Sequence, residues 1–206
     1  TIEDSKWSSH KLQFSKFNYL QKTLEKPCET ITLDDWLNNF PADLVKGESL
    51  LLNDLPILLD DFFKLPEIQK QQLRKNINQM MQGMMHFLKH RQSNNQLTLS
   101  SNNELNQYCF FVAGLVGELL TVFFSSSFNE FNITDELIIN SFHFGLFLQK
   151  INILKDQLSD EQLGRQFMPS RNSVRDSIEC HAAQAFQYIK SLPIITGRPY
   201  RIFCAW

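Results

Sequence analysis

Apolar residues recur every three or four positions along most of this chain, which is the spacing of one face of an α-helix. The pattern predicts long helices over four segments: 66–90, 101–124, 134 into 152–160, and 173–191. It also predicts one helix within 6–31, ending near Pro27, and shorter helical pieces over 33–65, where Pro41 and Pro56 interrupt the pattern. We therefore expect an all-α fold.

Polar residues at the predicted helix starts support these boundaries. Ser101 and Glu104 form a capping-box pattern, in which each side chain satisfies a backbone N–H group of the first turn. Thr134 precedes two acidic residues, and Pro66 precedes Glu67, so both segments begin with residues that suit the positive end of a helix.

The composition agrees with a helical protein and excludes some functional classes. The 206 residues include 18 Phe and only 7 Gly, which favours long helices over hairpins, and we expect one domain over 1–206. The net charge of −2 provides no electrostatic reason to expect nucleic acid as a partner. Four widely spaced cysteines without a CxxC pair argue against a zinc site, and we expect buried free thiols in a reducing compartment.

No membrane anchor is expected within the chain. The opening residues TIEDSKWSS lack the apolar region of a signal peptide, and the run YCFFVAGLVGELLTVFF is interrupted by Glu118. No uninterrupted apolar run reaches the roughly 18–20 residues that span a bilayer. A lipid-soluble ligand remains compatible with this pattern.

A polar stripe interrupts the apolar helix that ends in NILKDQLSD. Asn152, Asp156 and Asp160 lie four residues apart, and Gln149 extends the stripe by one turn, so all four fall on one helical face. Oxygen ligands at this spacing suit Mg²⁺, which prefers carboxylates and retains several waters. The alternative is a polar outer face, in which Lys150 and nearby Lys155 are ordinary surface charges.

Other segments suggest a cavity wall, although each has a simpler explanation. Ala113, Gly114 and Gly117 are small residues that let another helix or a bulky ligand come close, and Tyr108 precedes them by more than one turn. The Met-rich segment MMQGMMHF favours core packing, and His86 with His90 lacks a third metal ligand. Asp60 and Asp61 are expected to be a solvated pair.

Four segments, in order along the chain, carry a resemblance to a known family. YCFFVAGLVG, GLFLQKINILKDQLSD, GRQFMP and IFCAW resemble landmark segments of the squalene/phytoene synthase family of head-to-head prenyl transferases, and TIEDS is similar to the later part of that family's first aspartate-rich motif. The resemblance implies a single isoprenoid-synthase-type domain around a central cavity. It also implies further helices before TIEDS and after FCAW, so we expect the chain to be incomplete at both ends.

The resemblance implies a reaction, its cofactors and its partners. Two farnesyl diphosphate molecules would bind through Mg²⁺ and condense to presqualene diphosphate, which the squalene-forming members reduce with NADPH. The alternatives are phytoene or dehydrosqualene formation, and a non-catalytic relative that binds prenyl lipids. We expect a monomer in the cytoplasm, with peripheral membrane association left open.

The family's site residues map onto this sequence by motif. Tyr108 matches the tyrosine of the first half-reaction, while Glu3 and Asp4 match the later acids of the first motif. Asn152, Asp156 and Asp160 match the second metal motif. The expected substrate-binding residues are Gln149, Arg165, Phe111, Ala113, Gly114, Gly117 and Phe203.

Several positions depart from the family pattern. Ser159 replaces a common acid of the second motif, Lys155 a more usual arginine, and Phe111 a common tyrosine. The leading aspartate of the first motif would precede Thr1.

Overall fold

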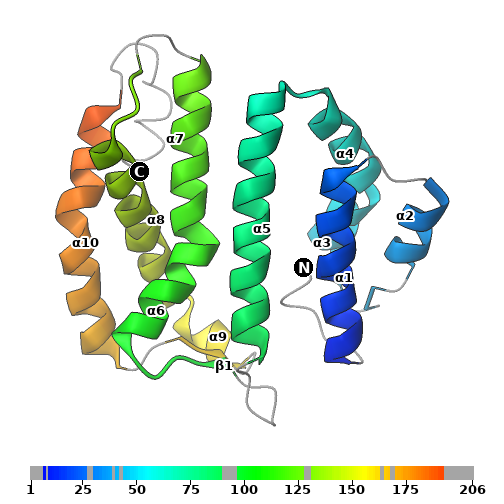
Figure 1. The fold of residues 1–206 in the computed structure, drawn as a ribbon. Helices are drawn as coiled ribbons and strands as arrows, with labels where there is room; N and C mark the ends of the chain where they lie inside the picture. Colours follow the sequence, from blue (N-terminus) through cyan, green and yellow to red (C-terminus); the bar gives the residue numbers. More distant parts are fainter. Residues whose placement is uncertain are drawn as a thin grey trace. The chain divides into compact units, whose positions relative to one another are not determined.

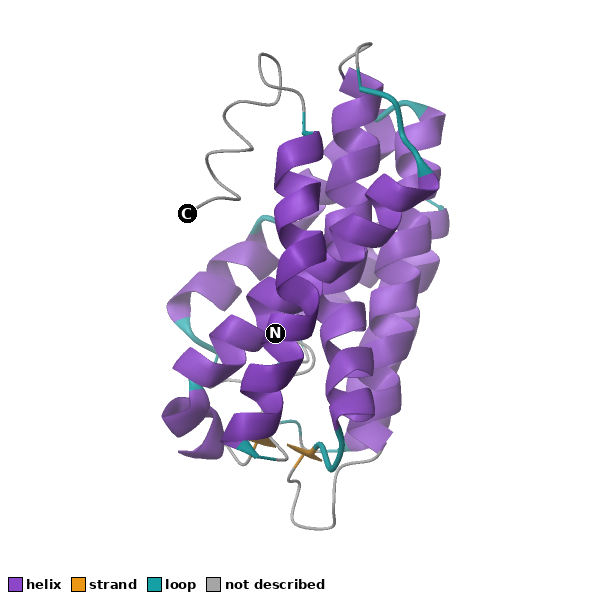
Figure 2. Cartoon of the chain, turned by 90° about the vertical axis from the view of Figure 1, so that its left-hand side faces the viewer, coloured by secondary structure: helices purple, strands orange, loops and turns teal. Residues whose placement is uncertain are grey.

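A computed structural model describes residues 7, 9–26, 30–38, 40–41, 44–89, 97–127, 131–162, 165–167 and 170–192. Nearly all of these residues are helical, which confirms the all-α prediction (Figures 1 and 2). The elements are α1 (His10–Glu25), α2 (Thr30–Leu37), α3 (Lys46–Asn53), α4 (Leu55–Lys64), α5 (Glu67–Lys89), β1 (Leu97–Thr98), α6 (Asn102–Cys109), η1 (Phe110–Gly114), α7 (Leu115–Ser127), α8 (Asp135–Lys155), α9 (Gln157–Gln162), β2 (Arg165–Gln166) and α10 (Arg171–Ser191).

The chain divides into two compact units, Thr1–Met81 and Gln82–Trp206, and α5 contributes residues to both. The first unit packs α1, α2 and α4 around a core that contains Trp36 and Phe62. Its Asp60 and Asp61 are exposed and pair with Lys64, as expected of a solvated acidic pair. The candidate site residues that the structure describes all lie in the second unit.

The predicted capping residues begin the helices of the second unit. The Ser101 hydroxyl accepts a hydrogen bond from the Glu104 N–H at 3.2 Å, and the Glu104 carboxylate accepts one from the Ser100 N–H at 2.6 Å. The Thr134 hydroxyl accepts from the Leu137 N–H at 3.1 Å. Both helix starts follow from local side-chain chemistry, which explains why the sequence pattern located them.

The helix predicted over 101–124 contains one wide turn. Between α6 and α7, Phe110–Gly114 form the π-helix η1, and the Leu115 N–H donates to the Phe110 carbonyl. Short π segments often occur at functional sites because they change the direction in which the following side chains point. Apolar periodicity does not reveal such a turn, so the sequence predicted one regular helix.

Helix α8 lies at the centre of the second unit and contacts α6, η1, α7, α9 and α10. A Cβ built on Gly145 would lie 2.6 Å from the Ala113 carbonyl carbon, and one on Gly117 would lie 3.0 Å from the Ser141 carbonyl carbon and closer still to its oxygen. The small residues of this segment therefore bring α8 against the backbones of η1 and α7. For Gly117, the geometry favours the helix-packing explanation over a space for ligand.

The predicted helix through 152–160 is broken, which corrects the sequence interpretation. Helix α8 ends at Lys155, Asp156 has φ −94° and ψ 10°, and α9 begins at Gln157. The Ser159 hydroxyl donates to the Asp156 carbonyl at 2.8 Å. The backbone angles of Asp156 lie outside the helical region, so α8 and α9 are two helices and not one.

Two short parallel strands were not predicted. Leu97 pairs with Arg165 and Thr98 with Gln166, so β2 is held beside the start of the α6 segment. Leu97 and Leu99 are buried in the same cluster as Tyr108. Because each strand has only two residues, alternation of apolar and polar positions could not have identified them.

The described cysteines agree only in part with the expectation of buried free thiols. Cys109 is free and buried, whereas Cys180 is free but exposed, contrary to the prediction of buried thiols. Cys28 and Cys204 lie outside the described residues.

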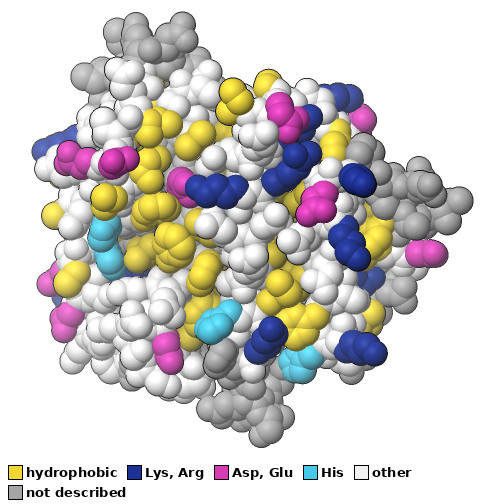
Figure 3. Space-filling view, in the orientation of Figure 1, with side chains coloured by type: hydrophobic (Ala, Val, Ile, Leu, Met, Phe, Trp, Pro, Cys, Tyr) yellow, Lys and Arg dark blue, Asp and Glu magenta, His cyan; other side chains and the backbone are white. Residues whose placement is uncertain are grey.

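Among the described residues, two helices are long and apolar enough to cross a membrane, namely Asn102–Ser126 and Asp135–Lys155. The core helices of soluble proteins pass the same test of length and composition. On the face shown in Figure 3, hydrophobic side chains gather over α7.

Candidate functional site

The structure describes one part of the predicted site. Glu3, Asp4 and Phe203 lie outside the described residues. Asn152 and Asp156 are exposed at the C-terminal end of α8, and Gln149 is half-buried one turn earlier. The surface at the end of α8 therefore carries the amide and the first carboxylate of the predicted metal motif.

The break at Asp156 leaves the three motif residues one turn apart. The Asp156 N–H donates to the Asn152 carbonyl at 2.8 Å, and the Asp160 N–H donates to the Asp156 carbonyl at 2.9 Å. These i to i+4 hydrogen bonds continue across the junction of α8 and α9. The spacing that motivated the metal hypothesis is thus retained although the regular helix is not.

Asp160 and Arg165 form an ion pair in which both side chains are largely buried. Arg165 Nη1 lies 3.6 Å from Asp160 Oδ1, and the two side chains are 18% and 16% exposed. Arg165 belongs to β2, which pairs with β1, while Asp160 belongs to α9. The tertiary fold therefore brings the predicted diphosphate-binding arginine next to the last acid of the metal motif.

Tyr108 lies between two aromatic rings from distant parts of the chain. Its ring centroid is 4.8 Å from that of Phe167, directly after β2, and 5.4 Å from that of Phe87 on α5, which contacts it edge-on. Tyr108 is 7% exposed and shares its cluster with Ile153, the neighbour of Asn152. The tyrosine thus packs beside the elements that carry Asn152 and Arg165.

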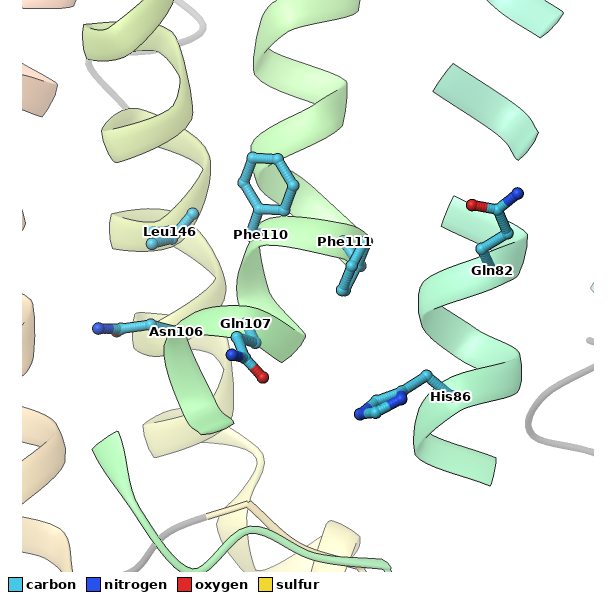
Figure 4. A pocket seen from close by; sticks show the side chains of 7 residues that line it. All are labelled: Gln82, His86, Asn106, Gln107, Phe110, Phe111 and Leu146. Atoms are coloured by element: carbon cyan, nitrogen blue, oxygen red, sulfur yellow. The ribbon is translucent and has the colours of Figure 1, made fainter. Parts of the chain in front are cut away.

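A pocket of about 540 Å³ lies in the second unit (Figure 4). Gln82 and His86 of α5 line one side, and α6 and η1 line the other. The lining residues are Gln82, His86, Asn106, Gln107, Phe110, Phe111 and Leu146. Of the predicted substrate residues, Phe111 lines this pocket, whereas Tyr108 and the acidic motif do not.

Phe111 reaches this position because residue 83 has no side chain. A Cβ built on Gly83 would lie 2.5 Å from the Phe111 Cβ and 2.6 Å from its Cδ1. A Cβ on Gly114 would instead lie 3.0 Å from Leu146 Cδ1, a side-chain terminus. The shape of the pocket wall therefore depends on the close approach of Phe111 to the backbone of α5.

Lys150 is completely buried, so the view of this residue as ordinary surface charge is wrong. Its Nζ donates to Asn106 Oδ1 at 2.5 Å and to Ser177 Oγ at 2.6 Å. Burial lowers the pKa of Lys150 to about 8, and Cys109 and Cys180 oppose the shift. Burial also raises the pKa of the Cys109 thiol to about 12, with Lys150 opposing. In contrast, Lys155 is exposed, as that view required.

Two histidines join α8 to α10 near Lys150. His143 Nδ1 and His181 Nδ1 lie 2.7 Å apart, so one nitrogen donates and the other accepts. Burial lowers the pKa of His181 to about 4, and the charges of Lys150 and His143 act in the same direction. Burial, followed by Lys150, also lowers the pKa of His143. Both rings are therefore neutral at physiological pH.

Sequence reasoning missed the groups around Lys150, although a signal was present. Leu146, Lys150 and Ile153 follow the i, i+4, i+7 spacing of one helical face, and the two apolar residues are buried. A lysine at the centre of such a face is expected to be buried with hydrogen-bond partners. The partners themselves, Asn106 and Ser177, have no sequence pattern that links them to position 150.

The oxygen donors at the end of α8 fit a magnesium ion. Asn152 and Asp156 are exposed and present an amide and a carboxylate, which are ligands that Mg²⁺ prefers. Within the described ranges, no three His, Cys, Asp or Glu side chains cluster closely enough to hold a metal alone. Magnesium is commonly held by one or two carboxylates together with substrate phosphates, so this donor set is compatible with it.

Comparisons with known proteins agree with the segment matches. A family model described as squalene/phytoene synthase matches residues 59–176, which include Tyr108, Asp156 and Arg165. The squalene synthases of Rattus norvegicus and Homo sapiens are each 38% identical over 120 residues, which make up 58% of this chain and 27% of either relative. The squalene synthase of Saccharomyces cerevisiae is 30% identical over 171 residues, 82% of this chain and 36% of that relative. The chain thus matches a minor part of each relative's length.

Proposed function

The chain belongs to the squalene/phytoene synthase family, and we propose that the protein is a Mg²⁺-dependent prenyl transferase that joins two farnesyl diphosphates head to head. One observation carries this proposal. The exposed oxygen donors of α8, the Asp160–Arg165 pair and the enclosed Tyr108 come from elements that pack together in the second unit. This combination suits a reaction that needs both diphosphate binding and an apolar environment.

The polar residues bind the charged end of the substrate. Asn152 and Asp156 would hold Mg²⁺ together with the substrate phosphates, and Asp160 would complete the motif. When bound, Mg²⁺ neutralises the diphosphate and makes it a better leaving group. Glu3 and Asp4, the acids of the first motif, are proposed to hold Mg²⁺ in the same way. The Gln149 amide is proposed to donate a hydrogen bond to the bound substrate.

Arg165 and Tyr108 act on the diphosphate and on the reacting carbon chain. The Arg165 guanidinium, held by β2 beside Asp160, donates to diphosphate oxygens, a geometry for which guanidinium is well suited. The Tyr108 hydroxyl orients the allylic group and can exchange a proton at its Oη atom. The rings of Phe87 and Phe167 exclude water from Tyr108, and aromatic faces also stabilise a nearby cation.

The proposed product is squalene, formed through presqualene diphosphate with NADPH as the reductant. The names of the relatives in rat, human and yeast support this branch of the family. Phytoene or dehydrosqualene formation is the alternative within the same chemistry. We also propose that the protein contacts a membrane surface, because the substrate tails and the product are apolar.

Diphosphate release by the full-length protein tests the activity. The protein is incubated with farnesyl diphosphate and Mg²⁺, and released diphosphate is compared between the natural protein, Asp156→Ala and the matched control Glu136→Ala. Glu136 is an exposed acid at the opposite end of α8. We expect release to require Asp156 and not Glu136. If the natural protein released no more diphosphate than Asp156→Ala does, a non-catalytic prenyl-binding protein would be favoured.

Product analysis separates the two branches of the family. Extracts from reactions with farnesyl or geranylgeranyl diphosphate, each with and without NADPH, are analysed by mass spectrometry. We expect squalene from farnesyl diphosphate only when NADPH is present. Phytoene from geranylgeranyl diphosphate, with no squalene from farnesyl diphosphate, would overturn the assignment to the squalene branch.

A further inference from the structure

Lys150 joins three helices of the second unit at one buried point. The residue itself belongs to α8, its acceptor Asn106 belongs to α6, and its acceptor Ser177 belongs to α10. The Ser177 hydroxyl also lies 3.5 Å from Asn106 Oδ1, so the three polar groups are in mutual contact. The ammonium group has only donors, so the Asn106 oxygen must face it.

This arrangement is costly for stability alone. Among the described residues, no carboxylate pairs with Lys150, and its two acceptors are neutral oxygens. Taking an ammonium group out of water without an opposite charge is unfavourable, and an apolar residue of similar volume would fill the same space. An apolar residue would lack directional hydrogen bonds, however, so it would not define how α6 is rotated relative to α8.

Lys150 and its acceptor Asn106 each lie close in sequence to proposed site residues. Asn106 is two residues before Tyr108 on α6, and the π-helix η1 begins two residues after Tyr108. On α8, Lys150 lies between Gln149 and Asn152. A displacement of the last turn of α6 relative to α8 would therefore move the Tyr108 hydroxyl relative to the polar face of α8.

We propose that Lys150 is a positioning residue, whose hydrogen bonds to Asn106 and Ser177 set the position of Tyr108 relative to Asn152 and Asp156. Its effect on turnover rests on the proposed prenyl transferase activity, whereas its effect on Tyr108 does not. Lys150 contacts neither substrate nor metal in this proposal. It acts through the orientation of α6 and α10 on α8.

The first experiment separates positioning from stability. Lys150→Met removes the charge and leaves Asn106 Oδ1 without its ammonium donor, and Asn106→Leu removes that acceptor. The double variant replaces the Lys150–Asn106 pair by apolar groups, which is generally less destabilising than losing one member of the pair, while the second acceptor Ser177 stays in place. The exposed Lys190 near the end of α10 provides the matched control Lys190→Met.

We expect both single variants to lower the thermal midpoint and the double variant to regain part of it, because Ser177 still lacks its ammonium donor. Turnover, measured in the full-length protein well below each midpoint, should remain reduced on the order of 10- to 100-fold in the double variant, in kcat rather than KM. Recovery of kcat together with stability would mean that the linkage is only structural and would overturn the proposal.

A second measurement does not depend on activity. The chain contains four tyrosines, so 3-fluorotyrosine labelling gives a small set of ¹⁹F resonances, and Tyr108→Phe assigns that of Tyr108. Lys150→Met and Asn106→Leu should each shift this resonance, the double variant should keep it shifted, and Lys190→Met should not affect it. An unchanged Tyr108 resonance in Lys150→Met would overturn the proposal. Absent turnover in the natural protein with shifted resonances would reject the proposed function but retain the positioning role.

Discussion

The ring of Phe111 packs directly on the backbone of Gly83, in space that any other residue at position 83 would occupy. A Cβ on Gly83 would lie 2.5 Å from Phe111 Cβ, closer than non-bonded carbon atoms approach. Phe111 belongs to η1 and lines the pocket, and Gly83 belongs to α5 and follows Gln82, which also lines it. This relationship links the shape of the pocket to a single missing side chain.

Gly83→Ala should destabilise the protein although alanine is the better helix former. Alanine contributes up to about 1 kcal/mol in a helix, but overpacking a buried contact costs about 1–3 kcal/mol. We expect a net loss of about 1–2 kcal/mol in the free energy of unfolding, measured by chemical denaturation. Phe111→Ala in the same chain should reduce that loss, because it removes the Cγ and Cδ1 atoms that the new Cβ would meet.

Gly47→Ala is the matched control for this prediction. No atom lies within 4 Å of a Cβ built on Gly47, which is also helical. This substitution should leave stability unchanged or raise it by up to about 1 kcal/mol. Equal effects of alanine at positions 83 and 47 would contradict the close packing of Phe111.

Gly117→Ala should be more harmful than Gly114→Ala. The Cβ at position 117 would meet the Ser141 backbone, which cannot rotate away, so α7 and α8 would have to separate. At position 114 the obstacles are Leu146 Cδ1 at 3.0 Å and Phe110 Cδ2 at 3.1 Å, which are side-chain atoms. We expect a loss of about 3 kcal/mol for Gly117→Ala and less than about 1 kcal/mol for Gly114→Ala, measured as unfolding free energies. Similar losses would show that helix contact does not limit residue 117.

Tyr108→Phe should reduce activity while the aromatic packing of the ring is kept. The substitution keeps the ring between Phe87 and Phe167 and removes only the hydroxyl. If the hydroxyl orients the allylic group, kcat for diphosphate release should fall about 100-fold, a typical effect of losing a positioned proton-transfer group. The thermal midpoint is measured on the same samples.

Tyr188→Phe serves as the control, because it should lower stability and leave activity unchanged. The Tyr188 hydroxyl lies 2.8 Å from the Thr121 hydroxyl, which also donates to the Gly117 carbonyl at 2.7 Å. Loss of this buried hydrogen bond should cost about 1 kcal/mol and leave kcat unchanged. The same loss of kcat in both variants would exclude a specific role for Tyr108.

The His143–His181 pair should make the protein less stable in mild acid. Burial lowers the pKa of His181 from 6.5 to about 4, with contributions from Lys150 and His143, so the folded state resists protonation. Between these values the unfolded chain binds more protons, and stability therefore falls as the pH decreases from 6.5 to about 4. The shift corresponds to a loss of about 3 kcal/mol at the acidic end of this range.

Denaturation curves at several pH values test this sign. The unfolding free energy of the natural protein is compared with that of His181→Asn, which cannot take up a proton at this position. We expect a shallower pH dependence for His181→Asn over this range. Parallel curves would mean that His181 titrates normally in the folded protein.

The helices and much of the candidate site were predictable because their signals are local. Ser101, Glu104 and Thr134 cap helices through backbone groups three or four residues away, so neighbouring sequence suffices to identify them. The match to the family likewise depends on contiguous segments. The sequence accordingly nominated Tyr108 and the acidic motif as candidate site residues from local segments alone.

Features that depend on distant neighbours were not predictable. The π-helix at Phe110–Gly114 lies where Gly145 packs against the Ala113 carbonyl, a contact between residues far apart in the chain. The pairing of Asp160 with Arg165 similarly needs the parallel register of β1 and β2. No spacing rule within one segment describes either contact.

The sequence by itself determined the helical class, the helix starts and the residues with oxygen donors, because periodicity and capping act within a few turns of one helix. Only the tertiary structure decided that Lys150 is buried, since this depends on α6 and α10 closing over α8 and supplying Asn106 and Ser177. The same lysine on an isolated helix would extend into water. Its environment is a property of three packed helices, which is why the sequence alone left it among the surface charges.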